Sequence, residues 1–441
     1  MSKKLLLVSC RSPFLENDRI YPPLGLLYLK AACNLFAPHV QVDLADEYDL
    51  NNPEIFAEYD FVGVSIMTPQ RTEAKRILEA VKSRWPKKNM IAGGPHVLHY
   101  TDDIKNDPWD YLVRGDGEKT LPLILSGEPV ERVSHELIST KELALMPKPN
   151  RLAEVEFLKK YKYRLRDLNA TTMLTGRGCP MNCKFCEDAR TNIRWTSFGN
   201  TEDELKDIVQ LGYQGVYLFD DLFAINLNKC KPYLDLLKAS GLKFRCNVHA
   251  KFMTEEFAKA LAEAGCIEVA FGAESGSQAM LDRMDKMTTV QQNFDCVKHC
   301  KKYGMVVKAF LMIGLPGETR ETVADTEKFI LESGIDDAQV AIYYPYKGTQ
   351  FREEVDKGAT GDLFFTGEGL GAYGTKSDLT QSVVRTKELS AEELIQIREE
   401  LIRKYKFATH TTRNKEDAEF FDTHLKENVE YSSGGDLGCK S

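Results

Sequence analysis

The sequence lacks several features that would assign it to particular classes of protein. No uninterrupted apolar run reaches the roughly 20 residues that a membrane-spanning helix needs. Lys and Arg number 58 against 66 Asp and Glu, a formal net charge of −8, so there is no basic excess for nucleic acid or an anionic membrane. Most of the cysteines are scattered, without the spacing of a disulfide framework. These absences predict a cytoplasmic protein with no membrane span and no nucleic-acid partner.

Three of the eleven cysteines do gather, within the stretch 176–187. Cys179, Cys183 and Cys186 have the spacing Cys-x3-Cys-x2-Cys, and Gly, Pro and Asn around them let the backbone wrap a compact object. A loop this short cannot form disulfides among all three thiols. A structural zinc site usually needs four protein ligands, and no second Cys-x2-Cys pair follows. An iron–sulfur cluster held by three cysteines leaves one iron open for a ligand. Either metal fits the spacing alone.

Residues 1–135 predict a doubly wound α/β domain, because short apolar runs alternate with helical stretches. The expected strands are 5–9, 40–44, 61–66, 90–92 and 111–113, with helices at 24–35 and 72–84 and an edge strand within 130–138. Ligands of such sheets bind beyond the carboxyl ends of the strands. Tyr21, Ser65, Gly93 and Gly94 lie in the loops there, although a Gly-Gly pair also suits a plain strand-to-helix turn.

Residues 136–170 read as a connector, with a proline-punctuated break at 146–150. From 171 to 350 a repeated strand–helix pattern predicts a partial (β/α)6 barrel with functional residues at the carboxyl ends of its strands. A capping box is expected to open a helix at Thr201, and Thr254 is expected to open another helix. Residues 351–441 predict a small helical region with a helix capped by Ser390 and a flexible tail. Its Gly- and aromatic-rich loop at 361–374 suits either a covering loop over the substrate or a plain domain-packing loop. The expected barrel strands are 172–175, 215–219, 244–248, 267–271, 306–313 and 338–344.

Three further motifs follow predicted barrel strands. Glu274 and Ser275 belong to Gly-Ala-Glu-Ser-Gly-Ser at 272–277, where a carboxylate can accept hydrogen bonds from hydroxyls or an ammonium group. Ser275 or Ser277 could instead cap a helix. A ten-residue motif at 310–319, Phe-Leu-Met-Ile-Gly-Leu-Pro-Gly-Glu-Thr, has glycines that expose backbone amides, and its Thr319 suits a helix cap. Asp220, in an Asp pair after the second strand, could bind a ligand or cap a helix beginning near residue 226.

Together these motifs resemble the radical S-adenosylmethionine (SAM) superfamily, preceded by a cobalamin (B12)-binding-type domain. The resemblance covers about residues 171–350 for the radical SAM core and 1–130 for the cobalamin-type domain. It implies a 4Fe-4S cluster, SAM and cobalamin as cofactors. The implied ligand residues are Cys179, Cys183 and Cys186 for the cluster, Phe185, Asp220, Glu274, Ser275, Gly314 and Pro316 for SAM, and Tyr21, Ser65, Gly93 and Gly94 for cobalamin.

The resemblance implies that one SAM methylates cobalamin while a second yields a 5′-deoxyadenosyl radical, as in a methyltransferase acting on an unactivated carbon. A reductase or ferredoxin-type donor would supply electrons. The Asp-x-His-x-x-Gly motif of some cobalamin proteins is absent. Rearrangement, cyclisation or transfer of another SAM-derived group, with or without cobalamin, is therefore the alternative within the family. A metal-cluster sensor or scaffold is the alternative outside it. The sequence assigns no catalytic residue, and the substrate is equally compatible with a small molecule, a lipid or a peptide side chain.

Overall fold

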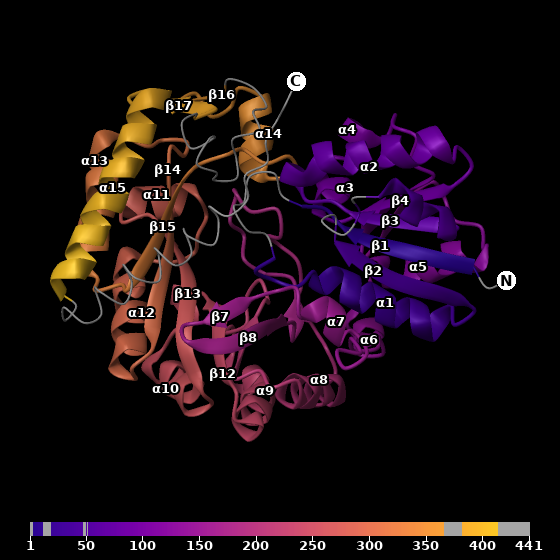
Figure 1. The fold of residues 1–441 in the computed structure, drawn as a ribbon. Helices are drawn as coiled ribbons and strands as arrows, with labels where there is room; N and C mark the ends of the chain where they lie inside the picture. Colours follow the sequence, from indigo (N-terminus) through magenta and orange to yellow (C-terminus); the bar gives the residue numbers. More distant parts are fainter. Residues whose placement is uncertain (1–2, 12–18, 47–49, 51, 366–381, 413–441) are drawn as a thin grey trace, which may run out of the picture.

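The computed structural model describes residues 3–11, 19–46, 50, 52–365 and 382–412. Two sheets organise these residues: a six-stranded sheet A near the N-terminus and a seven-stranded sheet B after it. Figure 1 shows the sheet A domain in indigo and purple beside the barrel-like sheet B domain in magenta to yellow. The predicted α/β class, with a doubly wound domain followed by a partial barrel, is confirmed. The predicted domain boundaries stay predictions.

Sheet A is wholly parallel and buried on both faces. Leu5 and Leu7 pack toward helices α1 (Leu24–Phe36) and α5 (Gly117–Ser126), whereas Leu6 packs toward α2 (Arg71–Arg84). This two-sided burial explains why its strands read as continuous apolar runs. The strands, all at predicted positions, are β1 (Lys3–Ser9), β2 (Val40–Asp46), β3 (Phe61–Ser65), β4 (Asn89–Gly93), β5 (Tyr111–Gly115) and β6 (Val133–Glu136), in the order β2-β1-β3-β4-β5-β6.

The connector between the sheets is more structured than its sequence indicates. It holds α6 (Thr140–Leu143) and α7 (Val155–Leu158), and ends in β7 (Tyr163–Leu165), which pairs antiparallel with β8 (Leu168–Met173). Leu27 of α1 packs with Phe157 of α7 in one apolar cluster. The connector therefore binds to the first domain while its end adds an edge strand to sheet B.

Sheet B is an open half-barrel in which every strand after β7 runs parallel to its neighbour. All six predicted strands are present, although the first is displaced toward the N-terminus, at Leu168–Met173. The core lies between the strands and the helices that cover them. After β8 the strands are β11 (Gly215–Leu218), β12 (Lys243–Val248), β13 (Cys266–Glu274), β14 (Val306–Ile313) and β15 (Asp337–Ile342), and the helices are α8 (Phe198–Gln210), α9 (Leu227–Ser240), α10 (Glu255–Glu263), α11 (Gln278–Arg283), α12 (Val290–Lys302) and α13 (Arg320–Glu332).

The predicted caps had mixed outcomes. Thr254 accepts a hydrogen bond from the Phe257 amide and caps α10 as predicted. The capping box predicted at Thr201 is wrong, because Ser197 caps α8 one turn earlier and Thr201 lies inside the helix. The glutamate of that predicted box, Glu204, is buried and serves a different purpose: it pairs with Arg151.

The C-terminal helix α15 (Ala391–Thr412) packs on the barrel. Ser390 and Glu393 form the predicted capping box, and Leu394 and Leu401 are buried in the barrel core. A two-stranded sheet, β16 (Leu363–Phe365) with β17 (Val384–Thr386), follows α14 (Gln350–Asp356). Most of the predicted covering loop at 361–374, and the tail with Cys439, lie outside the described residues.

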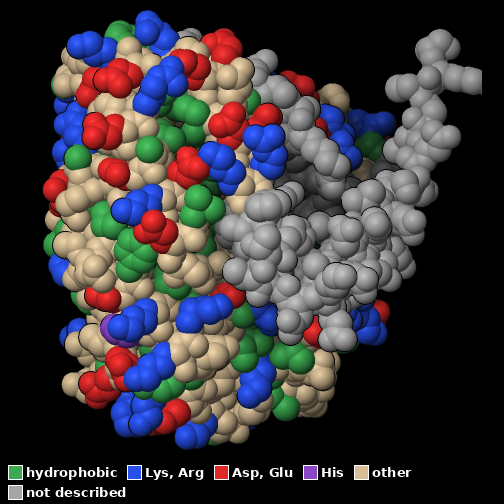
Figure 2. All heavy atoms as spheres, turned by 90° about the vertical axis from the view of Figure 1, so that its left-hand side faces the viewer, with side chains coloured by type: hydrophobic (Ala, Val, Ile, Leu, Met, Phe, Trp, Pro, Cys, Tyr) green, Lys and Arg blue, Asp and Glu red, His purple; other side chains and the backbone are tan. Residues whose placement is uncertain are grey.

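The helices that cover sheet B form a surface with charges of both signs. Figure 2 shows Lys and Arg interspersed with Asp and Glu over this face. None of the helices described is both long enough and apolar enough to cross a membrane.

The buried pair of Arg151 and Glu204 yields a stability prediction. Arg151 is fully buried and donates to Glu204 Oε1 at 2.9 and 2.6 Å, while the Tyr28 hydroxyl donates to Oε2 at 3.0 Å. Glu204→Ala would leave a buried guanidinium charge without its carboxylate, so we expect a loss of about 3–5 kcal/mol in the free energy of unfolding, measured by urea denaturation. Glu202→Ala, on the exposed side of the same helix, should change it by less than about 0.5 kcal/mol. Equal effects of the two substitutions would contradict the prediction.

Candidate active site

The cysteine loop leaves sheet B at the carboxyl end of β8 and returns through a short hairpin. Its stem consists of β9 (Gly176–Arg177) and β10 (Arg194–Trp195), which pair antiparallel. Gly178 has φ +97°, and a Cβ there would lie 2.7 Å from the Asn192 carbonyl, so the turn requires glycine. The Cys179 amide donates to Thr191 Oγ1 at 2.8 Å, and the Thr191 amide donates to the Cys179 carbonyl at 3.0 Å. The loop is therefore closed at its base before the second and third cysteines.

All three cysteines belong to one apolar cluster with Met181 and Leu222. Burial raises the pKa of Cys186 to about 12, with the Cys183 and Cys179 sulfurs among the further causes, and burial also raises the pKa of each of the other two thiols. Within the described residues, no three His, Cys, Asp or Glu side chains are grouped so that they could hold a single metal ion. The thiols share an apolar, partly buried site, which suits soft sulfur-bound iron.

The Asp pair after β11 holds the entrance of this loop. Asp220 is 2% exposed and accepts hydrogen bonds from the Thr175 amide at 2.7 Å and from the Thr175 hydroxyl. Asp221 accepts from the Gly178 amide at 2.8 Å. Burial raises the pKa of Asp220 to about 7. The helix-cap alternative for this pair is wrong, because Asn226 caps α9.

Glu274 ends β13 in a strained conformation beside the cysteines. Its φ is +60°, and its Oε1 accepts from Lys286 Nζ at 2.7 Å, with both side chains buried. Lys286 Nζ also lies 5.7 Å from the centroid of the Phe185 ring. Glu274, Phe185 and the cysteine loop are thus brought together around one buried cation.

The sequence analysis missed Lys286, since no motif marked it. The one sequence signal for a buried amine at this position is that Lys286 lies between two apolar residues, Met284 and Met287. Asp285 and Met287 on either side of it have φ values of +52° and +58°. Departures from ordinary backbone geometry on both sides of one charged residue indicate that the fold holds Lys286 in place at a cost.

Ser275 does not share this environment. Its hydroxyl lies 3.0 Å from Thr326 Oγ1 of α13 and accepts from the Ser277 amide at 3.1 Å. Ser277 precedes α11, but its side chain makes no capping hydrogen bond. The structure therefore shows Ser275 engaged in joining β13 to α13.

His249, at the end of β12, is a second buried group that the sequence analysis missed. Its Nδ1 accepts from the Lys251 amide at 3.2 Å, which places the ring proton on Nε2 when the imidazole is neutral. Nε2 is buried, and the Lys286 backbone is a weak hydrogen-bond partner of the ring. Burial, with the Lys286 charge nearby, lowers the pKa of His249 to about 3.

The motif after β14 is organised by Glu318. Its two carboxylate oxygens accept from the Gly314 amide at 3.1 Å and from the Thr322 hydroxyl at 2.8 Å. Gly314 has φ +82°, and Pro316 follows it in the same tight turn. Thr319 caps α13 as predicted. This arrangement fixes the turn that contains Gly314 and Pro316 at the carboxyl end of the barrel.

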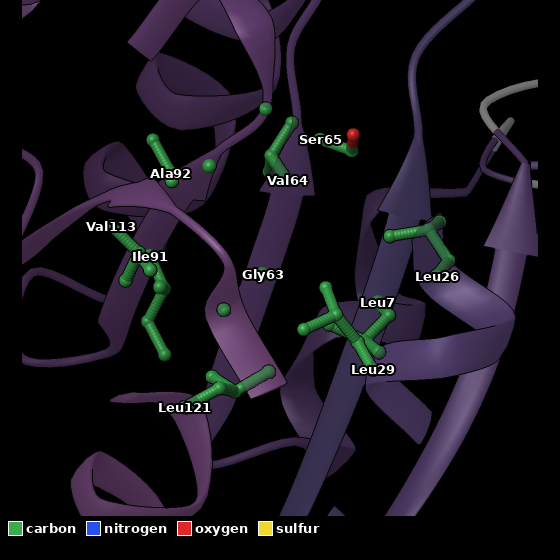
Figure 3. Close-up of a pocket in the computed structure, with 14 residues that line it drawn as sticks. Leu7, Leu26, Leu29, Gly63, Val64, Ser65, Ile91, Ala92, Val113 and Leu121 are labelled. Carbon is green, nitrogen blue, oxygen red and sulfur yellow. The ribbon is translucent and has the colours of Figure 1, made fainter. Parts of the chain in front are cut away.

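Sheet A contains a pocket of about 70 Å³ on the face covered by α1 and α5. Figure 3 shows Leu7, Leu26, Leu29 and Leu121 around it, with Ser65 at the end of β3. Ser65, Gly93 and Gly94, three of the four residues predicted for cobalamin, line it. An added Cβ at Gly93 meets nothing closer than the Val113 carbonyl at 3.6 Å, so the pocket is open there. The apolar walls and exposed backbone suit a flat base more than a charged group.

Tyr21, the fourth predicted cobalamin residue, does not line this pocket. Its ring packs against Tyr163 at 4.9 Å and Phe219 at 5.2 Å between centroids, so it contacts sheet B. Its side chain is 37% exposed at the junction of the two domains. His96, two residues after Gly94, is buried in α3 (Pro95–His99), and its ring stacks on that of Tyr100 with 5.2 Å between centroids.

Ion pairs join the two sites. Asp116, after β5, accepts from Arg177 Nη1 at 2.9 Å and also pairs with Arg194. Arg177 Nη2 donates to Glu118 at 2.5 Å. Because Arg177 and Arg194 are the paired residues of the hairpin stem, the cysteine loop is attached directly to the sheet A domain.

The geometry defines a class of protein: an α/β protein with a thiol-rich loop after the first parallel strand of a half-barrel and a small apolar pocket in an adjoining doubly wound domain. Comparison with known proteins agrees. Residues 173–330 match the model of the radical SAM superfamily, and residues 17–125 match that of the B12 binding domain.

Individual relatives cover most of the chain. An uncharacterized methyltransferase, PH0819, from Pyrococcus horikoshii is 30% identical over 75% of this chain and 78% of its own length. The anaerobic magnesium-protoporphyrin IX monomethyl ester cyclase of Rubrivivax gelatinosus is 25% identical over 67% of this chain and 58% of its own. The structure of the radical SAM methyltransferase TsrM from Kitasatospora setae, with cobalamin and a 4Fe-4S cluster bound, superposes with a TM-score of 0.68 at 18% identity over 86% of this chain and 83% of that one. The chain belongs to the radical SAM superfamily and carries a B12 binding domain.

Glu318 makes a pH-dependent contribution to stability whose sign follows from its environment. Burial raises its pKa to about 7 from an ordinary 4.5, so the folded chain retains a proton that the unfolded chain releases. The resulting stabilisation is fully present below pH 4.5 and is lost as the pH rises through 7. Relative to wild type, Glu318→Gln should therefore gain up to about 3 kcal/mol in unfolding free energy between about pH 5 and pH 8, measured by urea denaturation. Glu321→Gln, at an exposed position of α13, should follow the wild-type profile. Parallel profiles for wild type and Glu318→Gln would contradict the assignment.

Proposed function

We propose that this chain is a cobalamin-dependent radical SAM methyltransferase that methylates an unactivated carbon. The observation that carries the proposal is the junction at Asp116. Residues on either side of it, Gly115 and Gly117, line the sheet A pocket, while its carboxylate binds the stem of the cysteine loop. A B12-type pocket and a cluster-type loop are thereby held at one boundary, as an enzyme that uses both cofactors on one substrate requires.

The residues around the cysteine loop fit a 4Fe-4S cluster and SAM. Cys179, Cys183 and Cys186 would hold the cluster, with Phe185 beside the adenine. Lys286, buried against Glu274, would compensate the methionine carboxylate, and Glu274 would then accept hydrogen bonds from SAM. In the bound enzyme the cluster and SAM supply the 5′-deoxyadenosyl radical, and cobalamin carries the methyl group. The further SAM contacts that we propose are Asp220, Ser275, Gly314 and Pro316.

The sheet A pocket fits the nucleotide tail of cobalamin. Its leucines provide apolar contact for a flat base, and Ser65, Gly93 and Gly94 offer polar and backbone groups at its rim. Tyr21, exposed at the domain junction, would contact the corrin rather than the tail. With no Asp-x-His-x-x-Gly motif, we propose that cobalamin binds without a histidine ligand from this chain.

Methyl transfer is favoured over other radical chemistry by relatives named as methyltransferases. PH0819 has that name at 30% identity, and the chain covers 78% of it. The Rubrivivax gelatinosus cyclase, of which the chain covers 58%, supports cyclisation as the second candidate.

The proposed chemistry also bears on where the enzyme works and on the partners it needs. The ten cysteines that the structure describes are all free thiols, which supports a reducing, cytoplasmic location. A reductase or ferredoxin-type protein would supply the electron that radical SAM chemistry consumes. Small molecules, lipids and peptide side chains remain the candidate substrates.

Product analysis tests the proposed activity. The anaerobically reconstituted chain, given hydroxocobalamin, SAM, a strong reductant and candidate substrates, should release S-adenosylhomocysteine and 5′-deoxyadenosine in comparable amounts, measured by liquid chromatography and mass spectrometry. The triple variant Cys179→Ala, Cys183→Ala, Cys186→Ala should release no 5′-deoxyadenosine. Formation of 5′-deoxyadenosine with no S-adenosylhomocysteine under turnover would overturn methyl transfer and favour the cyclisation candidate.

Filling the sheet A pocket tests the cobalamin site separately. Gly93→Leu should project a side chain into the open space beside Gly93 and reduce hydroxocobalamin binding at least tenfold, measured by corrin absorbance after gel filtration. Gly93→Ala, whose single methyl group meets only ordinary contacts, should lose less affinity. The iron content of both variants should equal that of the wild type. Unchanged cobalamin binding by Gly93→Leu would show that the sheet A pocket is not part of the cobalamin site.

A further inference from the structure

The turn Gly115-Asp116-Gly117 belongs to both candidate sites. Gly115 and Gly117 line the sheet A pocket. The Asp116 carboxylate points out of the same turn to Arg177 and Arg194, the stem residues of the cysteine loop. Three consecutive residues therefore form a pocket wall on one side and an ion-pair anchor on the other.

This turn has little room to move independently of its surroundings. Gly115 has φ +82°, and a Cβ there would lie 2.2 Å from the Glu136 carbonyl. The Asp116 amide donates to that carbonyl at 2.8 Å, and Asp116 Oδ2 accepts from the Ile138 amide at 3.0 Å. At Gly117 an added Cβ would lie 2.9 Å from Leu29, itself a pocket residue. A ligand that displaces the pocket wall must therefore displace Asp116 as well.

The connection continues from Asp116 to the first cysteine. Arg177 and Arg194 face each other across the hairpin, and both bind Asp116 with side chains that are 18% exposed. Arg194 also donates to the Ile138 carbonyl at 2.8 Å. Cys179 follows Arg177 by two residues and is closed against Thr191. Since each contact is short and shielded from water, a shift of Asp116 changes the position of the cysteine loop.

We infer that Asp116 is a positioning residue that couples occupancy of the sheet A pocket to SAM binding at the cysteine loop. The inference rests on the proposed function, because cobalamin and SAM are the two ligands concerned. Binding of cobalamin fixes the Gly115-Asp116-Gly117 turn, which holds the loop stem in its binding geometry. Coupling of this kind is reciprocal, so each ligand changes the affinity of the other by the same factor.

A thermodynamic cycle on the full-length, cluster-reconstituted protein tests this coupling. The SAM dissociation constant is measured anaerobically by calorimetry, with and without saturating hydroxocobalamin, and the SAM-induced change in the electron paramagnetic resonance spectrum of the reduced cluster provides a second readout. In the wild type we expect cobalamin to change the SAM dissociation constant about fivefold or more. In Asp116→Asn the ratio of the SAM dissociation constants measured with and without cobalamin should fall to less than about twofold. Arg194→Gln should do the same, and is used in place of Asp116→Asn if that variant does not fold.

The matched control is Asp103→Asn. Asp103 pairs with Lys347 at 2.9 Å, and this ion pair also joins the sheet A domain to the barrel, but neither residue lines the pocket or the hairpin stem. Asp103→Asn should retain the wild-type ratio of the SAM dissociation constants measured with and without cobalamin. If Asp116→Asn acted only by loosening the domain interface, Asp103→Asn would lower that ratio as well.

Two results would overturn the inference. One is a SAM dissociation constant in the wild type that cobalamin does not change; the other is a wild-type ratio in both Asp116→Asn and Arg194→Gln. A protein that binds cobalamin but shows either result refutes the coupling alone. A protein that acquires no corrin absorbance refutes the proposed cobalamin dependence as well, so the two failures are distinguishable.

Discussion

The ion pairs between Asp116 and the two arginines of the hairpin stem are the contact on which the site depends. Sheet A and sheet B belong to separate domains, and each domain supplies only half of the candidate site. Arg177 and Arg194 are brought together by a hairpin whose strands are two residues long, and the Asp116 carboxylate of the other domain pairs with both. Glu118 supplies a second negative charge to Arg177. Burial strengthens such pairs when every partner is satisfied, and here backbone groups at Ile138 complete the arrangement. The cysteine loop thus has a fixed base on the sheet A domain.

The other half of the site is stabilised at the expense of local strain. Glu274, Asp285 and Met287 all have positive φ, although none is glycine. Each such residue costs of order 1–3 kcal/mol, which the surrounding packing must offset. Glu274 is itself one partner of the ion pair beside the cysteines, and Asp285 and Met287 flank the other partner, Lys286. Strain concentrated around one buried cation is typical of a binding site and not of a scaffold.

The sequence predicted the layers of the fold better than the contacts that join them. Apolar runs between helices located every parallel strand of both sheets, because burial on both faces leaves a continuous signature. The strands β7 and β9 were missed, since two or three residues give no period. Ser197 replaced Thr201 as a cap because both types of residue suit the role and only the backbone decides. The pairs of Asp116 span 61 and 78 residues, and no local pattern encodes a charge partner at that distance.

Several acidic residues of the motifs share one physical task. Where a strand ends and its loop begins, backbone amides lose their ladder partners and need acceptors. Asp220 accepts from the Thr175 amide, Asp221 from Gly178, Glu318 from Gly314 and Asp116 from Ile138. These carboxylates therefore shape the loops at the carboxyl ends of the sheets from within. The cost of burying them is visible at Asp220 and Glu318, whose pKa values burial raises to about 7. A motif recognised in sequence by its acidic residue can thus act on a ligand through the backbone that this residue holds.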